Sequence, residues 1–143
     1  MTLPLSVAAA QPRIVGQDLV ANVAAHADAV RRAGARLIVF PELSLTGYEL
    51  DAPLISPDDP TLAALIEACA EADAVALVGA PIEWCGAARI GVLEVTGTGV
   101  HPVYAKMCLG GDEPERFVAG PSPTVIVVDG WRVGIGVCKD TRI

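Results

Sequence analysis

The stretch DLVANVAAHADAVRRAGARLIVFPE, residues 18–42, decides the fold class of this chain. Apolar residues recur in its first half with the spacing of an amphipathic helix, and Gly34 is the type of residue that ends one. The wholly apolar run at residues 37–40 follows and stops at Pro41, as a short buried strand would. A helix followed directly by a buried strand is typical of α/β proteins.

The rest of the chain continues this alternation and then changes to paired strands. A second helix is expected to begin near Pro60, after the potential N-cap Asp59. Strands are expected at residues 3–10, 37–40, 75–80, 89–95, 100–106, 124–128 and 132–137. The last four form two β-hairpins, because turn-rich sequences separate them. The sequence therefore predicts one α/β domain with a mixed sheet over residues 1–143.

Composition and charge exclude several classes of protein. The chain has 143 residues, of which 52% are hydrophobic and 19% charged, and this balance excludes intrinsic disorder. Its net charge is −7 and its only adjacent basic pair is Arg31-Arg32, so we expect no nucleic-acid partner. Apolar runs are too short to span a membrane, and the N-terminus lacks a basic signal-peptide region. We therefore expect no membrane partner and a cytoplasmic location.

The cysteines and histidines are spaced too far apart for a structural metal site. Neither a Cys-x-x-Cys pair nor a pair of nearby histidines occurs, so we expect no metal and no cofactor. In the cytoplasm the four cysteines are expected to be free thiols. Cys69 lies on the apolar stripe of the second helix and is expected in the core, whereas His26 has polar neighbours and is expected in solvent.

Three chemically capable residues lie at the ends of expected strands. Glu42 follows the strand at residues 37–40, Lys106 ends one hairpin and Cys138 ends the other. Ligand sites of open α/β sheets form just beyond such strand ends. Singly, these residues can be a solvated acid, a surface lysine and a buried thiol. Together they can form a nucleophilic site, in which a base removes the thiol proton and a cation stabilises the resulting charge.

Four stretches carry a resemblance to a known family: LSVAAAQ (residues 5–11), FPELSLTGY (40–48), YAK (104–106) and GIGVCKD (134–140). The chain resembles the nitrilase, or carbon–nitrogen hydrolase, superfamily. The resemblance implies an α-β-β-α sandwich, with Glu42 as general base, Lys106 as the catalytic lysine and Cys138 as nucleophile. It also implies hydrolysis of amide, carbamoyl or nitrile carbon–nitrogen bonds of small molecules through a thioester, without a cofactor.

The resemblance also implies a second active-site glutamate within GGDEPERFVAG, residues 110–120. Glu113 fits the commoner family pattern and is preferred, Glu115 fits a rarer one, and either can be a solvated loop acid. Tyr48 is expected to line the pocket entrance and contact substrate, or else to pack under the loop after Glu42. Asp140 adjoins the cysteine, where its side chain can simply orient the turn.

The main departure from the family pattern is length. Family members continue past the cysteine into the other half of the sandwich, whereas this sequence ends five residues after Cys138. We therefore expect a partial domain, truncated after the nucleophile strand, that forms homo-oligomers and has negligible activity alone. The alternative function is a catalytically inactive fragment or a partner-binding half-domain. A serine hydrolase is disfavoured, since no G-x-S-x-G motif occurs.

Overall fold

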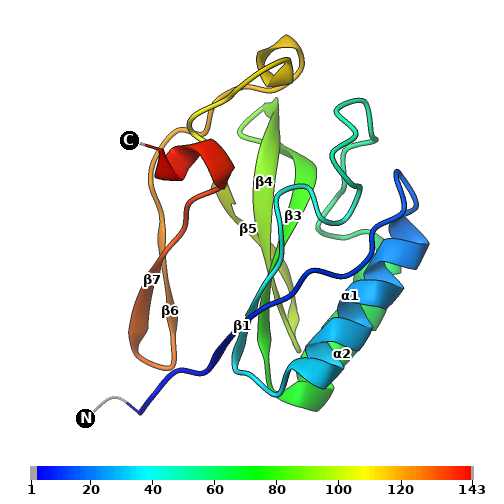
Figure 1. The fold of residues 1–143 in the computed structure, drawn as a ribbon, viewed down its shortest axis with the longest axis vertical. Coiled ribbons are helices and arrows are strands. Elements are labelled where there is room, and N and C mark those ends of the chain that lie inside the picture. The colour runs from blue at the N-terminus through cyan, green and yellow to red at the C-terminus, as the bar shows by residue number, and fades with distance from the viewer. Residues whose placement is uncertain (1–2, 143) are drawn as a thin grey trace.

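A computed structural model describes residues 3–142 and contains a five-stranded mixed sheet (Figure 1). The spatial order of its strands follows the sequence, from β1 to β5. The first three strands are parallel, and β4 runs antiparallel to both of its neighbours, β3 and β5. The strand bounds are Val7–Ala9 (β1), Leu37–Val39 (β2), Val75–Trp84 (β3), Ala87–Thr96 (β4) and Gly99–Ala105 (β5). A separate hairpin joins β6 (Val125–Val128) to β7 (Trp131–Gly134).

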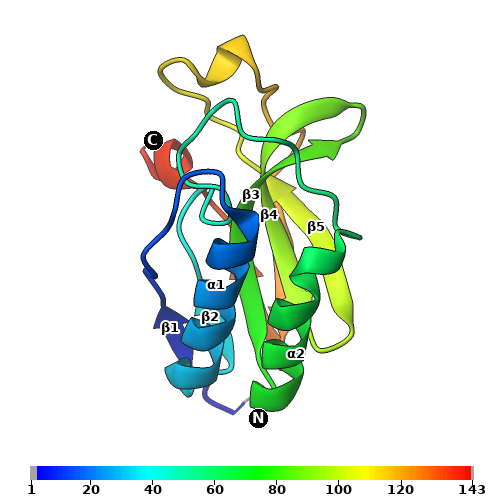
Figure 2. The ribbon, with the colours of Figure 1, turned by 90° about the vertical axis from the view of Figure 1, so that its right-hand side faces the viewer.

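Two helices lie side by side on one face of the sheet (Figure 2). Helix α1 (Leu19–Ala33) begins where the Asp18 carboxylate accepts a hydrogen bond from the backbone N–H of Ala21 at 3.0 Å. It ends at Gly34, whose φ of 58° places it in the left-handed conformation that glycine adopts freely. Helix α2 (Ala63–Ala72) follows the short 3₁₀ turn η1 (Pro60–Leu62), which Asp59 caps.

The sheet separates two apolar layers. Alternate residues of β3, including Ala76 and Val78, pack against the helices, whereas Leu77 belongs to the opposite layer. That second layer contains Ile126 and Val128 of β6, so the β6–β7 hairpin covers the face of the sheet away from the helices. The result is a helix layer, a sheet and a hairpin layer.

The predicted α/β class with a mixed sheet is confirmed. Three layers of the expected four-layer sandwich are formed by the described residues 3–142. The structure adds a long β3–β4 hairpin that the sequence analysis missed. Its turn places Cys85 at φ 52° and Gly86 at φ 73°. Cysteine is unusual in this left-handed conformation, so the turn had no recognisable signature.

The strand expected at residues 132–137 was too long, because β7 ends at Gly134. Cys138 therefore does not end a strand, but begins the 3₁₀ turn η3 (Cys138–Thr141). Over residues 3–142, no helix combines the length and the apolarity that crossing a membrane requires.

Candidate active site

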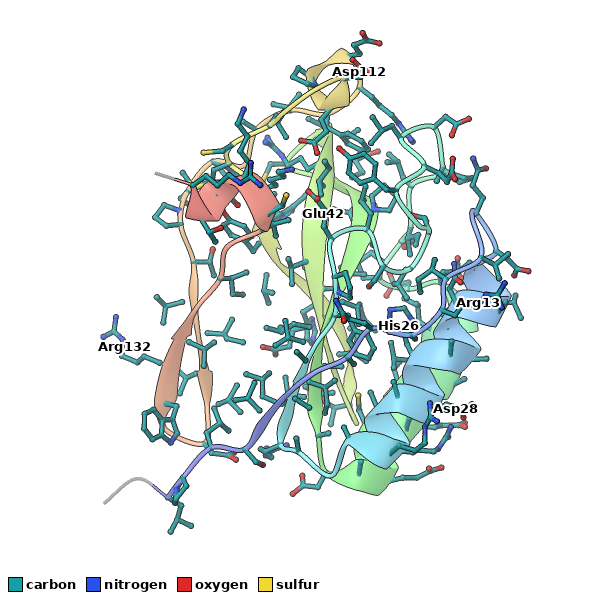
Figure 3. All side chains as sticks on the ribbon, viewed as in Figure 1. Arg13, His26, Asp28, Glu42, Asp112 and Arg132 are labelled. Atoms are coloured by element: carbon teal, nitrogen blue, oxygen red, sulfur yellow. The ribbon has the colours of Figure 1, made fainter. Side chains whose placement is uncertain are left out.

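The segments that follow β2, β5 and β7 meet at one end of the sheet and enclose a polar cleft of about 320 Å³. All five residues expected at the site line this cleft. They are Glu42, Tyr48, Lys106, Glu113 and Cys138. Figure 3 shows Glu42 at this end of the sheet, close to the C-terminal turn. The structure thus brings together residues that are as much as 96 positions apart in the sequence, from position 42 to position 138.

Lys106 is the centre of the polar network. Its Nζ donates hydrogen bonds to Glu42 Oε1 at 2.6 Å and to Glu113 Oε1 at 2.7 Å. Only 2% of the Lys106 side chain is exposed, against 14% for Glu42. Burial lowers the pKa of Lys106, but the two carboxylates outweigh it and hold that pKa above its ordinary value. The ammonium therefore stays charged although it is buried.

Glu113 is held from three sides. Besides Lys106, the Tyr48 hydroxyl donates to its Oε1 at 2.6 Å and the Gly110 N–H donates to its Oε2 at 2.9 Å. Burial raises the pKa of Glu113, but these hydrogen bonds lower it more, so the pKa lies below its usual range. The same bond to Glu113 raises the pKa of Tyr48 to about 12. Of the two candidate glutamates, Glu113 lies buried in the cleft and Glu115 is exposed.

The loop that carries Glu42 packs directly on β3. Leu43 adopts a left-handed conformation with φ 53°, which turns the chain immediately after Glu42. Beneath it, Gly79 leaves room for the loop. A Cβ atom at this position would collide with the backbone N of Leu43 and the carbonyl of Pro41. The close approach of these two backbones therefore requires glycine at position 79.

His26 of α1 anchors the same loop, so the expectation that it is solvated was wrong. It is fully buried, stacks on Phe40 and points toward the sheet (Figure 3). Its Nδ1 lies 2.7 Å from the Asn22 carbonyl and its Nε2 lies 2.9 Å from Ser44 Oγ. A carbonyl can only accept, so Nδ1 carries the proton and Nε2 accepts from the serine hydroxyl. Burial lowers the pKa of His26 to about 4, which keeps the ring neutral.

Cys138 is exposed and lies at the junction of two cavities. One is the polar cleft, and the other is an apolar pocket of about 230 Å³ lined by residues such as Phe40, Leu77 and Val92. Its φ of 47° is a left-handed conformation that residues other than glycine rarely adopt. Cys69, in contrast, is buried in the core as expected, and burial raises the pKa of its thiol to about 11.

The site also contains residues that sequence reasoning did not find. Tyr104 was noted only as part of the YAK motif, yet its hydroxyl donates to Asp140 behind the cleft at 2.7 Å. Asn22 was missed as well, although its amide donates to the Leu45 carbonyl in the Glu42 loop at 3.0 Å. Within residues 3–142, no cluster of three or more His, Cys, Asp or Glu side chains is arranged to hold a metal ion.

Comparison with known protein families and sequences gives consistent matches. The family model described as carbon-nitrogen hydrolase matches residues 6–143. A hydrolase of Mycobacterium tuberculosis (strain CDC 1551 / Oshkosh), Hydrolase MT0498, is 31% identical and aligns with 89% of this chain and 50% of its own. An (R)-stereoselective amidase of Pseudomonas sp is 30% identical over 75% of this chain and 40% of its own. The chain thus spans about half the length of the curated relatives it matches.

Solved structures share the fold. XC1258 from Xanthomonas campestris, a CN-hydrolase superfamily protein with an arsenic adduct in its active site, superimposes with a TM-score of 0.85 at 22% identity. The match covers 96% of this chain and 54% of that one. A cysteine-to-alanine mutant of the amidase from Nesterenkonia sp. AN1, in complex with butyramide, superimposes with a TM-score of 0.80 at 24% identity. That match covers 97% of this chain and 57% of the amidase.

Proposed function

The chain belongs to the carbon–nitrogen hydrolase family, and on that premise we propose that it carries the catalytic residues of an amidase-type hydrolase. Cys138 is the nucleophile, Glu42 the general base and Lys106 the cation that stabilises developing negative charge. Glu113 and Tyr48 hold this group in place and face the substrate. The substrate is a small molecule with an amide, carbamoyl or nitrile carbon, and no cofactor takes part.

For an amide or carbamoyl carbon, the reaction proceeds in two halves. Glu42 accepts the thiol proton as Cys138 Sγ attacks the substrate carbon, and the Lys106 ammonium stabilises the oxyanion of the tetrahedral intermediate. The carbon–nitrogen bond then breaks, and ammonia or an amine leaves with the proton from Glu42. A water molecule, deprotonated by Glu42, attacks the resulting thioester. Collapse of the second intermediate releases the acid and returns the proton to the thiol.

The observation that carries this proposal is the shared ammonium of Lys106. It lies within hydrogen-bond distance of both Glu42 and Glu113, and all three line the cleft that Cys138 also lines. A buried cation flanked by two carboxylates fixes the position of the Glu42 carboxylate within this cleft. Electrostatic stabilisation is strongest where such charges are held in place before the reaction.

Amides are the favoured substrate class. One curated relative is an (R)-stereoselective amidase, and one structural neighbour is an amidase in complex with butyramide. The apolar pocket beside Cys138 is compatible with a short aliphatic acyl group. A cytoplasmic location, a single partial domain over residues 1–143 and homo-oligomer formation stay predictions.

The test is ammonia release from short aliphatic amides, measured for the protein complemented with the other half of the family's sandwich and for two cysteine variants in the same complemented form. Cys138→Ala should abolish turnover without changing the thermal melt, because it removes one exposed sulfur atom. Cys85→Ala, which removes another exposed sulfur that does not line the cleft, should leave turnover unchanged. Full activity in the Cys138 variant would refute the assignment of the nucleophile.

A second candidate function, a half-domain that binds a partner, is favoured by one surface. Val125 and Val127 point outward from β6 and are 49% and 67% exposed. Apolar side chains in a row on a strand are more typical of an interface than of a solvated face. Light scattering together with the ammonia assay distinguishes the two candidates. A monomeric protein that releases ammonia from amides excludes the partner-binding half-domain.

A further inference from the structure

The Asp140 carboxylate lies behind the cleft and accepts four hydrogen bonds. Its Oδ1 accepts from the backbone N–H groups of Met107 at 3.1 Å and of Cys108 at 2.7 Å. Its Oδ2 accepts from the Tyr104 hydroxyl at 2.7 Å and from the Val137 N–H at 3.0 Å. Both oxygens therefore have two donors each, which is about the full capacity of an ionised carboxylate.

These donors come from two segments that each carry a residue of the site. Tyr104, Met107 and Cys108 flank Lys106 on both sides, and Val137 directly precedes Cys138. We propose that Asp140 is a positioning residue that holds Cys138 at a fixed place relative to Lys106. This inference rests on the proposed function, because it assigns Asp140 a role only if Cys138 and Lys106 act together.

The backbone conformation at Cys138 supports the role. The left-handed φ of 47° costs free energy in a residue with a side chain, and such strain persists only where surrounding contacts impose it. Asp140 supplies two of these contacts, since its carboxylate accepts from the Val137 N–H and its own N–H donates to the Val137 carbonyl at 3.0 Å. The Thr141 hydroxyl donates to the Cys138 carbonyl at 2.8 Å and completes the turn.

The charge of Asp140 is essential to the arrangement. Burial raises the pKa of this carboxyl, but the hydrogen bonds from Val137, Tyr104, Cys108 and Met107 outweigh burial and hold the pKa below its usual range. Asp140 is therefore ionised at neutral pH. Burial, followed by the hydrogen bond to Asp140 and its charge, raises the pKa of Tyr104, whose hydroxyl stays protonated and remains a donor.

Replacement of Asp140 by asparagine has a defined structural effect. Only one oxygen remains, and the fewest bonds are lost if it stays with the N–H groups of Met107 and Cys108. The new NH₂ group then faces Tyr104, whose hydroxyl can turn to accept, and Val137, whose N–H cannot. Asp140→Asn should therefore release the Val137–Cys138 turn while the Lys106 segment stays bound.

The experiment measures alkylation of individual cysteines by iodoacetamide, followed by peptide mass spectrometry, between about pH 6 and about pH 9. In the wild-type protein Cys138 should react fastest, with Cys85 as the internal reference. In Asp140→Asn the Cys138 rate at neutral pH should fall about tenfold or more, since small displacements of reacting groups have effects of this size. Its pH profile should move toward that of Cys85.

Two further variants complete the design. Tyr104→Phe removes a single donor without changing the size of a buried side chain, and should lower the Cys138 rate about fivefold. It keeps the inference testable if Asp140→Asn does not fold. Asp112→Asn is the matched control, since Asp112 is exposed, makes no capping hydrogen bond and lies far from Glu42 in Figure 3. In Asp112→Asn, Cys138 should be alkylated at the wild-type rate.

The outcomes distinguish a failure of the proposed function from a failure of the role assigned to Asp140. If wild-type Cys138 reacts no faster than Cys85, the proposed function fails and the inference falls with it. If wild-type Cys138 is selectively reactive, but both variants keep its rate and pH profile while their melting temperatures fall, Asp140 is only structural. That result would overturn the inference and leave the proposed function in place.

Discussion

The Nε2 atom of His26 lies 2.9 Å from Ser44 Oγ, so a helix residue is hydrogen-bonded to the loop that presents Glu42. Ser44 Oγ in turn accepts from the Gly79 N–H at 3.2 Å, which links the helix, the loop and the central strand β3. Burial keeps the ring neutral, and the serine hydroxyl then donates to Nε2. Protonation of His26 would place two N–H groups, from His26 and Gly79, against one hydroxyl oxygen.

Stability should therefore depend on pH through His26. Its pKa is lowered from 6.5 to about 4 on folding, so the unfolded chain binds more protons between these values. The contribution is fully present above pH 6.5 and is lost as the pH falls toward 4, with a total of about 3 kcal/mol. Urea unfolding across this range measures it. His26→Gln should flatten the curve, whereas His101→Gln, at an exposed position, should not.

Removal of the buried ammonium should destabilise the protein strongly. Lys106→Met leaves the carboxylates of Glu42 and Glu113 facing one another without a cation, at a cost of about 3–5 kcal/mol at neutral pH. The loss should be smaller in acid, where protonation relieves the repulsion. Lys139→Met is the control, because the Lys139 ammonium bonds only to an exposed backbone carbonyl at Leu109. Equal melting temperatures for the two variants would contradict the prediction.

The two glutamates of the 113–115 turn should respond differently to substitution. In Glu113→Gln the oxygen can stay with Lys106 and Tyr48, but the new NH₂ group faces the Gly110 N–H and loses that bond. In the complemented protein we expect the rate of ammonia release to fall about 100-fold, because Lys106 keeps a hydrogen bond at this position but loses an ionised partner. Glu115→Gln, at an exposed position, should retain the wild-type rate. Similar losses in both variants would contradict the assignment of Glu113.

A methyl group at position 79 should disturb the Glu42 loop. Gly79→Ala places its Cβ against the backbone of Pro41 and Leu43, which cannot move without displacing Glu42. We expect a loss of about 1–3 kcal/mol in urea unfolding, together with slower alkylation of Cys138. Gly134→Ala is the control, since no atom lies within 4 Å of its added Cβ. If the control is equally damaged, the close contact at Gly79 is not the cause.

Sequence reasoning found part of the site from strand ends that meet at one edge of a sheet, and the family resemblance supplied Glu113 and Tyr48. It expected Glu42, Lys106 and Cys138 there, and all three line one cleft. It missed the burial of His26, although this residue lies three positions after Val23 and four before Val30 on the apolar face of α1. Its partner in the loop is 18 positions away, and no local pattern links the two.

The turn at Cys138 could not be foreseen for a different reason. The sequence before it, with alternating glycine and apolar residues, is compatible with a continuing strand. Strand β7 ends at Gly134, and the Val137 N–H then bonds to the Asp140 carboxylate three residues later in place of a neighbouring strand. Asp140 is held in turn by the Tyr104 hydroxyl and by the Met107 and Cys108 N–H groups, which lie more than 30 positions away, and no local pattern reveals those contacts.

The tight turn at Cys85 and Gly86 has a consequence for the order of folding. It joins β3 and β4, and a second short turn joins β4 and β5, so residues 75–105 pair with their nearest neighbours in sequence. Pairings of low sequence separation form fast. Strands β1 and β2 must close long loops before they can pair, and the β6–β7 hairpin must close one before it can dock on the sheet. The cleft combines segments from all of these parts and forms late. Substitutions in it should therefore accelerate unfolding and leave the folding rate nearly unchanged.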